Sequence, residues 1–173
     1  MSETPQTPQW RVVVAADEAG LSYKDAIKAD LLKDPRVKEV IDVGINGDED
    51  TAYPHVAVAG ARKIAAGEAD RGIFVCGTGM GVAIAANKVK GIRASTAHDS
   101  FSVERLVLSN DAQVLTLGER VIGKELARRL AKEFLGYVFD PASASKAKVD
   151  AICGYETDAD ASDAAEADTV ASC

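Results

Sequence analysis

Short apolar runs rich in β-branched residues alternate along the chain with longer segments in which apolar positions follow a helical spacing. The short runs predict strands buried on both faces, and the longer segments predict amphipathic helices. The expected strands are residues 10–16, 37–43, 72–75, 91–96 and 112–117. The expected helices are residues 22–33, a stretch opening at 53, a stretch beginning near 81, and residues 100–108 and 124–135. Strands that alternate with helices at this interval predict an α/β fold with a five-stranded parallel sheet.

The two ends of the chain depart from this pattern. Residues 1–9 are polar, contain two prolines and predict a flexible leader. Residues 156–173 are rich in Ala, Asp and Ser and cannot bury enough apolar surface to order themselves, which predicts a disordered acidic tail. A chain of 173 residues is long enough for one α/β domain and short for two, so we expect a single domain over residues 10–155.

Composition and charge narrow the class of protein further. The net charge is −7, but the segment 154–173 carries six of the 27 acidic residues and no base, so the remaining 21 acids nearly balance 20 bases. No basic patch indicates nucleic-acid binding. No apolar stretch has the length of a membrane span, and residues 1–9 lack the order of a secretory signal, so we expect a cytoplasmic protein. Three widely spaced cysteines and two histidines predict neither a disulfide framework nor a metal site.

The most distinctive stretch runs from Cys76 to Gly81, between an expected strand and an expected helix. Gly77, Gly79 and Gly81 allow a sharp turn and bring backbone amides close to a bound anion. A helix start favours the thiolate form of a nearby cysteine, and Thr78 adds a hydroxyl. The stretch therefore predicts a site for phosphate or a developing oxyanion, with Cys76 as base or nucleophile.

Three other interpretations of this stretch compete with a catalytic one. Val82 stands where the dinucleotide-binding pattern needs its third glycine, so the sequence disfavours that cofactor. Lys88 is out of frame for a Walker loop. A purely structural buried cysteine stays open. Because ligands of parallel α/β sheets bind beyond the carboxyl ends of the strands, several polar residues are expected to converge there: Asp17, Cys76, His98, Asn110 and Arg120.

An ordered set of motifs extends over residues 11–152 and includes Tyr53-Pro54-His55. The others are Cys76-Gly-Thr-Gly-Met-Gly, Ala86-Asn87-Lys88, Gly91-Ile92-Arg93-Ala94, His98-Asp99-Ser100, Asn110-Asp111-Ala112 and Gly118-Glu119-Arg120. With them the chain resembles the ribose-5-phosphate isomerase B and galactose-6-phosphate isomerase family. The resemblance implies a three-layer Rossmann-like sandwich and an aldose–ketose isomerase of sugar phosphates without a cofactor. It also implies a homodimer or homotetramer with sites at the subunit boundary.

The resemblance assigns roles to individual residues. Cys76 matches the base that moves a proton between C1 and C2 through a cis-enediolate. The amides from Gly77 to Gly81, including those of Gly79 and Met80, match the oxyanion donors. Positions that contact substrate in the family are matched by Thr78, Asp17, Asn110 and Arg120.

Four positions depart from the pattern of ribose 5-phosphate isomerases. Glu18 replaces a histidine that follows the first aspartate, and Ser109 replaces the histidine that opens the furanose ring. The two phosphate-binding arginines align with Ala144 and Lys148, so Lys148 is expected to hold phosphate. A four-carbon sugar with a 4-phosphate cannot close a furanose and needs no ring opening. The expected reaction is therefore the interconversion of D-erythrulose 4-phosphate and D-erythrose 4-phosphate, as in the erythritol-catabolic branch of the family.

Some alternatives stay open at this point. Glu18 either binds a sugar hydroxyl or is a solvated turn residue. His98 either makes a local hydrogen bond at a helix start or replaces the missing ring-opening group. Arg120 either binds substrate or forms a surface ion pair. The alternative functions are an ordinary ribose-5-phosphate isomerase and a sugar-phosphate-binding subunit without catalysis.

Overall fold

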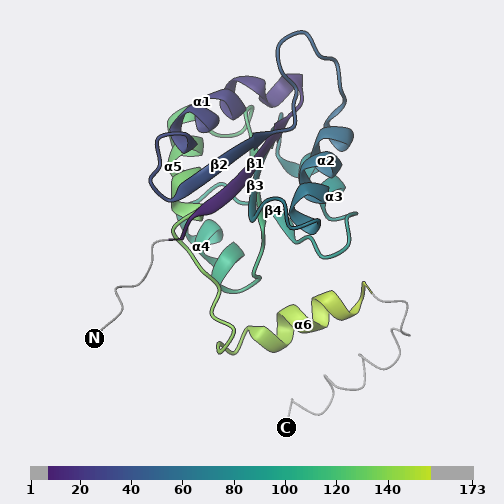
Figure 1. The fold of residues 1–173 in the computed structure, drawn as a ribbon, viewed down its shortest axis with the longest axis vertical. Coiled ribbons are helices and arrows are strands. Elements are labelled where there is room, and N and C mark those ends of the chain that lie inside the picture. Colours follow the sequence, from purple (N-terminus) through teal and green to yellow (C-terminus); the bar gives the residue numbers. More distant parts are fainter. Residues whose placement is uncertain (1–7, 157–173) are drawn as a thin grey trace.

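Five parallel strands form one sheet in the computed structural model, which describes residues 8–156 (Figure 1). The strands are β1 (Trp10–Ala16), β2 (Val37–Asp42), β3 (Arg71–Cys76), β4 (Ala94–Thr96) and β5 (Val114–Gly118). The α-helices are α1 (Leu21–Leu31), α2 (Tyr53–Ala65), α3 (Met80–Ala86), α4 (Ser100–Leu108), α5 (Lys124–Phe134) and α6 (Lys146–Gly154). A short 3-10 turn, η1 (Glu18–Gly20), precedes α1.

Helices cover both faces of the sheet. On one face, α1, α4 and α5 bury side chains such as Ile27, Leu106 and Phe134 against the strands. On the other face, α2 and α3 bury smaller side chains such as Ala57, Ala61 and Val82. The expected three-layer α/β sandwich with a five-stranded parallel sheet is confirmed.

The strand order is β2-β1-β3-β5-β4, so the chain leaves β1 toward one edge of the sheet and continues from β3 toward the other. In open parallel sheets this reversal leaves a crevice beyond the carboxyl ends of the two strands concerned, and ligands bind there. In this chain the crevice lies at the ends of β1 and β3. Asp17 follows β1 directly, and Cys76 is the last residue of β3.

Two elements differ from the sequence-based expectation. The strand expected over 91–96 is confined to Ala94–Thr96, because Gly91 has φ +85 and the Ile92 amide turns back to the carbonyl of Val89. The pattern does not predict α6, on which Val149 is the buried residue. This helix lies apart from the sheet, next to the segment before β4 (Figure 1), where the Gly91 amide donates to Glu156 and Arg93 donates to the Cys153 Sγ.

Most of the expected leader and tail, residues 1–7 and 157–173, lies outside the described residues. The parts that are described make contacts with the domain. Gln9 donates to the carbonyl of Pro35, and Glu156 accepts the bond from Gly91. Within residues 8–156, no helix combines the length and the apolar character needed to cross a bilayer.

Candidate active site

Cys76 ends the central strand β3, which is buried along its whole length. Its side chain is 5% exposed, and its Sγ accepts a hydrogen bond from the Gly79 amide at 3.1 Å. Gly79 has φ +81, a conformation that a residue without Cβ adopts at little cost, and α3 begins at the next residue. The turn therefore directs one backbone amide at the sulfur of Cys76.

The glycine turn lies directly against the end of β5. A Cβ on Gly79 would lie 2.9 Å from the carbonyl carbon of Leu117, and one on Gly118 would lie 2.6 Å from that of Thr78. Neither position can hold a side chain without moving backbone. Close contact between the two backbone segments therefore fixes the shape of the turn around the thiol.

Some of the amides in this turn are already used within it. The Gly79 amide donates to Cys76, and the Met80 amide donates to the hydroxyl of Thr78 at 3.3 Å. The expectation that every amide from Gly77 to Gly81 can hold an oxyanion is therefore too broad. The amides of Gly77, Thr78 and Gly81 have no such bond among the described residues and are left for a ligand.

Arg120 connects the glycine turn to a cavity beside it. Its amide donates to the Gly77 carbonyl at 3.0 Å, and its side chain lies over Gly77, where an added Cβ would be 3.4 Å from the Arg120 Cδ. The cavity has a volume of about 300 Å³. Its lining residues are Asp17, Glu18, Ala19, Asp50, Thr51, Ala52 and Arg120. Three carboxylates and one guanidinium make it suited to a ligand that carries hydroxyl groups.

Asp17 contributes a carboxylate at the end of β1. Its Oδ1 is buried and has no hydrogen-bond partner within the described residues. Burial raises the pKa of Asp17, although the amides of Ala19 and Gly20 and the charge of Arg120 oppose part of the rise. An unpaired buried acceptor in a cavity is ready to accept a hydrogen bond from a ligand hydroxyl.

His98 lies close to the same edge of the sheet but is already engaged. Its Nε2 accepts a hydrogen bond from the Gly118 amide at 3.0 Å, so the structure holds it as a neutral imidazole. Burial lowers the pKa of His98, against a smaller opposing effect of the Asp99 charge. The bond is not the local one considered from the sequence, because it reaches across to the end of β5.

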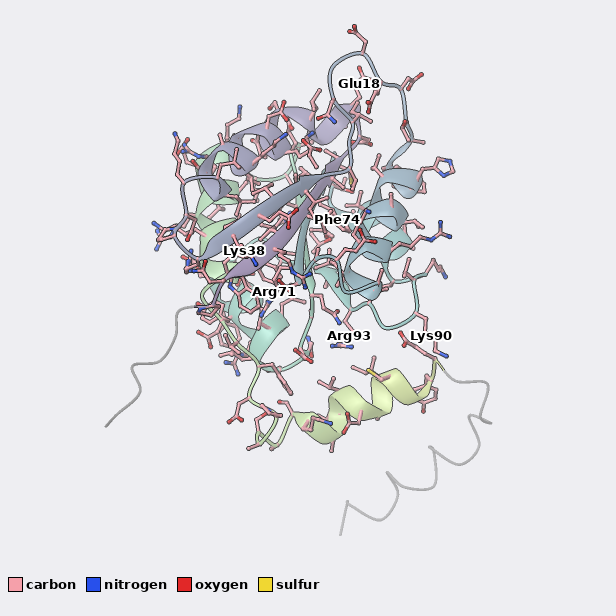
Figure 2. The ribbon with its side chains drawn as sticks, in the orientation of Figure 1. Glu18, Lys38, Arg71, Phe74, Lys90 and Arg93 are labelled. Atoms are coloured by element: carbon pink, nitrogen blue, oxygen red, sulfur yellow. The ribbon has the colours of Figure 1, made fainter. Side chains whose placement is uncertain are left out.

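Asn110 does not join Cys76 within one chain, contrary to the expected convergence, and neither do Ser109 and Lys148. α4 carries the chain from the end of β4 back to the start of β5, so Ser109 and Asn110 lie at the amino edge of the sheet. There the Asn110 carbonyl accepts a bond from Arg93, and Lys148 is exposed on α6 nearby. Figure 2 shows the separation, with Glu18 at one end of the molecule and Arg93 at the other, beside α6.

Two contributors were not predicted from the sequence. Residues 50–52 line the cavity, and the Tyr53 ring lies against Gly81, where an added Cβ would be 2.6 Å from the ring Cε2. Both follow the carboxyl end of β2, which is the neighbour of β1. The rule that ligands bind beyond the carboxyl ends of parallel strands predicted Asp17 and Cys76, and applied to β2 it would also have predicted residues 50–53. Within residues 8–156, no group of three or more His, Cys, Asp and Glu side chains is placed to hold a metal ion.

The fold and this site define an α/β protein with a polar cavity at the carboxyl edge of its sheet, on the same edge as a buried thiol. The profile of the Ribose/Galactose Isomerase family matches residues 12–152. The chain therefore belongs to the Ribose/Galactose Isomerase family, as the sequence motifs predicted, and is an isomerase.

Several relatives are similar over nearly their whole length. D-erythrulose-4-phosphate isomerase 2 of Mycolicibacterium smegmatis is 63% identical over 147 residues, which cover 84% of this chain and 97% of the relative. Ribose-5-phosphate isomerase B of Escherichia coli is 39% identical over 146 residues, covering 84% and 96%. The solved structure of Clostridium thermocellum ribose-5-phosphate isomerase B superimposes with a TM-score of 0.78 at 39% identity, covering 84% and 97%. These relatives are all named as isomerases of sugar phosphates.

Proposed function

We propose that this isomerase interconverts D-erythrulose 4-phosphate and D-erythrose 4-phosphate, with Cys76 as the base. The Cys76 thiolate takes the proton from C1 of the ketose, and the electron pair moves to form a cis-enediolate with negative charge on O2. The same group returns the proton to C2, while a proton passes from O1 to O2. Carbon 1 is oxidised and carbon 2 is reduced, so no external redox cofactor is required.

The turn around Cys76 suits both demands of this reaction. A positioned base contributes about 10²–10⁴-fold to the rate of a proton transfer. The enediolate oxygen is stabilised by backbone amides that point at it, and each such donor is worth about 3–4 kcal/mol. The amides of Gly77, Thr78 and Gly81 serve as these donors, and the Thr78 hydroxyl lies next to them.

The proposal of a tetrose phosphate rests on the absence of a histidine at position 109. Ser109 replaces the ring-opening histidine of ribose 5-phosphate isomerases, and the chain has two histidines in all. His98 uses its Nε2 to accept the Gly118 amide, and a proton added there would break that bond. His55 is exposed on α2, so neither histidine is an obvious replacement. An open-chain substrate removes the need for one, and the name of the relative at 63% identity supports this substrate.

We assign the sugar hydroxyls to the cavity beside Arg120. Asp17 and Glu18 accept hydrogen bonds from them, and Arg120 offsets the negative charge of the carboxylates. Placing a phosphate dianion next to Glu18 and Asp50 would cost free energy because like charges repel in a partly desolvated site. The phosphate therefore extends away from these residues.

We propose that a second copy of the chain completes the site. Ser109, Asn110 and Lys148 lie at the amino edge of the sheet, while Cys76 and Arg120 lie at the carboxyl edge. A pair of chains that brings opposite edges together places Asn110 and Lys148 of the partner subunit beside Cys76. The surface around the site supports this pairing, because the large apolar side chains Met80 (58% exposed), Ile84 (63%) and Phe101 (71%) lie open on α3 and α4.

The test is the turnover of purified protein on D-erythrulose 4-phosphate and D-ribose 5-phosphate, measured side by side as kcat/KM. We expect the tetrose phosphate to be preferred by at least about tenfold, the difference that 1.4 kcal/mol of transition-state binding produces. Equal or better turnover of ribose 5-phosphate would instead identify the protein as a ribose-5-phosphate isomerase. In that case His98 or Glu18 must open the ring.

A second arm of the test places histidine at position 109. We expect Ser109→His to raise kcat/KM for ribose 5-phosphate while changing that for the tetrose phosphate little. Ser109→Ala is the matched control and should leave the substrate preference unchanged. If Ser109→His has no effect on ribose 5-phosphate turnover, position 109 does not set the substrate.

A further inference from the structure

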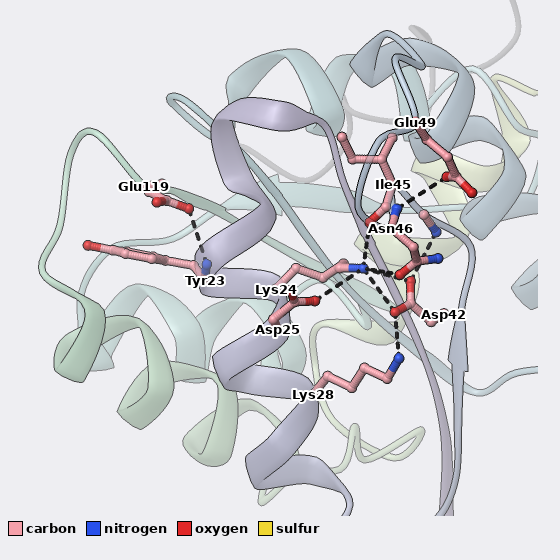
Figure 3. Close-up of polar contacts among 10 residues, drawn as sticks. Tyr23, Lys24, Asp25, Lys28, Asp42, Ile45, Asn46, Glu49 and Glu119 are labelled. Atoms are coloured by element: carbon pink, nitrogen blue, oxygen red, sulfur yellow. Dashed lines mark hydrogen bonds and ion pairs between the residues drawn. The ribbon is translucent and has the colours of Figure 1, made fainter.

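Lys24 on α1 is a fully buried cation, with 0% of its side chain exposed. Figure 3 shows its Nζ among acceptors from the end of β2, from the segment that follows β2 and from Asp25 on α1 itself. The Nζ donates to both carboxylate oxygens of Asp42 at 2.9 Å, to the Ile45 carbonyl at 2.8 Å and to the Asn46 Oδ1 at 2.9 Å. Burying an ammonium group is costly unless it is paired and hydrogen-bonded, and here its donors are fully occupied.

Lys28, one turn further along α1, provides a comparison within the same cluster. It donates to Asp42 at 2.7 Å but is 36% exposed, and it has no described bond to Ile45 or Asn46. Burial alone would raise the pKa of Asp42, but the bonds from Lys28 and Lys24 and from the Gly44 amide lower it. Both lysines therefore balance the charge of Asp42. Lys24 differs from Lys28 in an ion pair with its neighbour Asp25 at 3.4 Å and in its contacts to the Ile45 carbonyl and the Asn46 Oδ1, which lie beyond β2.

This segment leads to one wall of the proposed substrate cavity. From Asp42 the chain passes through Ile45 and Asn46, whose amide donates to Glu49 at 3.2 Å, and reaches residues 50–52 on the cavity. The opposite wall is formed by residues 17–19, which lie immediately before α1. Lys24 lies on that helix. Its contacts therefore connect α1, which follows residues 17–19, to residues 45 and 46, which precede residues 50–52.

We propose that Lys24 is a positioning residue that sets the distance between Glu18 and Asp50 across the substrate cavity. This inference rests on the proposed function, since it concerns how the same cavity holds the sugar hydroxyls. Lys24 does not touch the substrate. It holds residues 44–51 against α1, so the carboxylates on the two walls are in place before the substrate arrives.

Because the cavity is assigned the hydroxyl on C3, which is the substrate's one hydroxyl away from the reacting carbons, losing its shape weakens binding more than it slows proton transfer at Cys76. We expect Lys24→Met to raise KM for D-erythrulose 4-phosphate by about tenfold or more while kcat changes by less than about threefold. Amide hydrogen exchange in residues 44–51 should accelerate while exchange in β1 and β3 stays slow. Lys24→Arg, which keeps the charge and several donors, should recover part of the loss.

Lys28→Met is the matched control, because it removes the other cation of the cluster and leaves the Ile45 and Asn46 contacts intact. Its KM and its exchange pattern should remain close to those of the wild type. If Lys24→Met does not fold, Asn46→Ala removes one acceptor at an exposed position and should raise KM and local exchange to a smaller extent.

The proposal is overturned if a folded Lys24→Met protein matches Lys28→Met in both KM and exchange over residues 44–51. A uniform increase of exchange over the whole sheet also overturns it, because Lys24 would then contribute only to global stability. Failure of the proposed function is seen separately, as a wild-type protein without turnover of the tetrose phosphate. In that event the exchange measurement still decides whether Lys24 holds this segment.

Discussion

At the scale of single residues, chemistry is concentrated at Cys76, whose thiol is small, buried and bonded to one amide. A buried group of this size can be replaced by another small residue without a large cavity. Replacing Cys76 is therefore expected to change the catalytic rate with less effect on stability than replacing a larger side chain in the site would have.

We expect Cys76→Ala to lower kcat by about 10²–10⁴-fold, since the base is removed, while the fold and substrate binding are retained. Steady-state kinetics, circular dichroism and calorimetric titration with substrate measure the three quantities. Cys153→Ala, at a half-buried thiol next to Arg93, is the control and should keep full activity. Retained turnover in Cys76→Ala would move the base elsewhere, and Glu18 would be the next candidate.

His98 makes stability depend on pH. Burial lowers the pKa of His98 below the value of about 6.5 for an unfolded chain, so the unfolded state takes up a proton more readily. The stability contributed by neutral His98 is therefore present above about pH 6.5 and is lost as pH falls toward the lowered folded-state pKa.

The measurement is urea unfolding at about pH 7.5 and about pH 5.5, on either side of the unfolded-state value. His98→Gln is the comparison, because a glutamine carbonyl can accept the Gly118 amide without titrating. We expect the wild type to lose more free energy of unfolding between the two pH values than this variant does. Equal losses would mean that His98 has no part in the pH dependence.

At the scale of elements, the turn from β3 into α3 depends on both backbone conformation and close packing. Gly79 and Gly91 both have positive φ, +81 and +85, but their surroundings differ. A Cβ on Gly79 would lie 2.9 Å from the Leu117 carbonyl carbon, whereas one on Gly91 would meet nothing within 4 Å. Comparing substitutions at Gly79 and Gly91 therefore separates the free-energy cost of a side chain at positive φ from the cost of its contact with the Leu117 backbone.

We expect Gly91→Ala to lower the free energy of unfolding by about 1 kcal/mol, the cost of placing a side chain at positive φ. Gly79→Ala should cost about 2–4 kcal/mol, because backbone must also move, and it should remove most of the activity. Thermal unfolding and kcat report the two effects. Equal destabilisation by both substitutions would show that the contact with Leu117 is not tight.

Some helices and strands could be placed from the sequence pattern alone, and others could not. The buried strands β1 and β3 and the amphipathic α5 follow the period of their apolar residues, so their positions were predicted within one or two residues. The sequence pattern did not predict α6, because its buried contact is a single residue, Val149, and a single apolar position defines no helical stripe. β4 was predicted too long because Gly91 turns the chain before the strand can begin.

At the scale of the whole molecule, the same reasoning explains which site residues were grouped correctly. Asp17, Cys76 and Arg120 directly follow or end a strand, and the polarity of a parallel sheet places them at one edge. Ser109 and Asn110 follow a helix, and a crossover helix returns the chain to the opposite edge. The order of residues in one chain does not show how a second chain would place its amino edge, with Ser109 and Asn110, beside Cys76.

This arrangement gives a test of the shared site. We expect Cys76→Ala and Lys148→Ala to have little activity separately, because each pair of chains lacks one half of both sites. After unfolding and refolding together, mixed pairs regain one intact site, so activity should return to about a quarter of the wild-type value. No recovery, with pairs demonstrated by sedimentation, would mean that Cys76 and Lys148 act within one chain.

The contact between the glycine turn and β5 also bears on the order in which the protein is made. Residues 76–79 cannot take their final shape until Leu117 and Gly118 lie beside them, about 40 positions later in the chain. Pairing between strands so distant in sequence is slow compared with helix formation. During synthesis the thiol therefore leaves the ribosome about 40 residues before the strand that encloses it, so catalysis begins only when the sheet is complete.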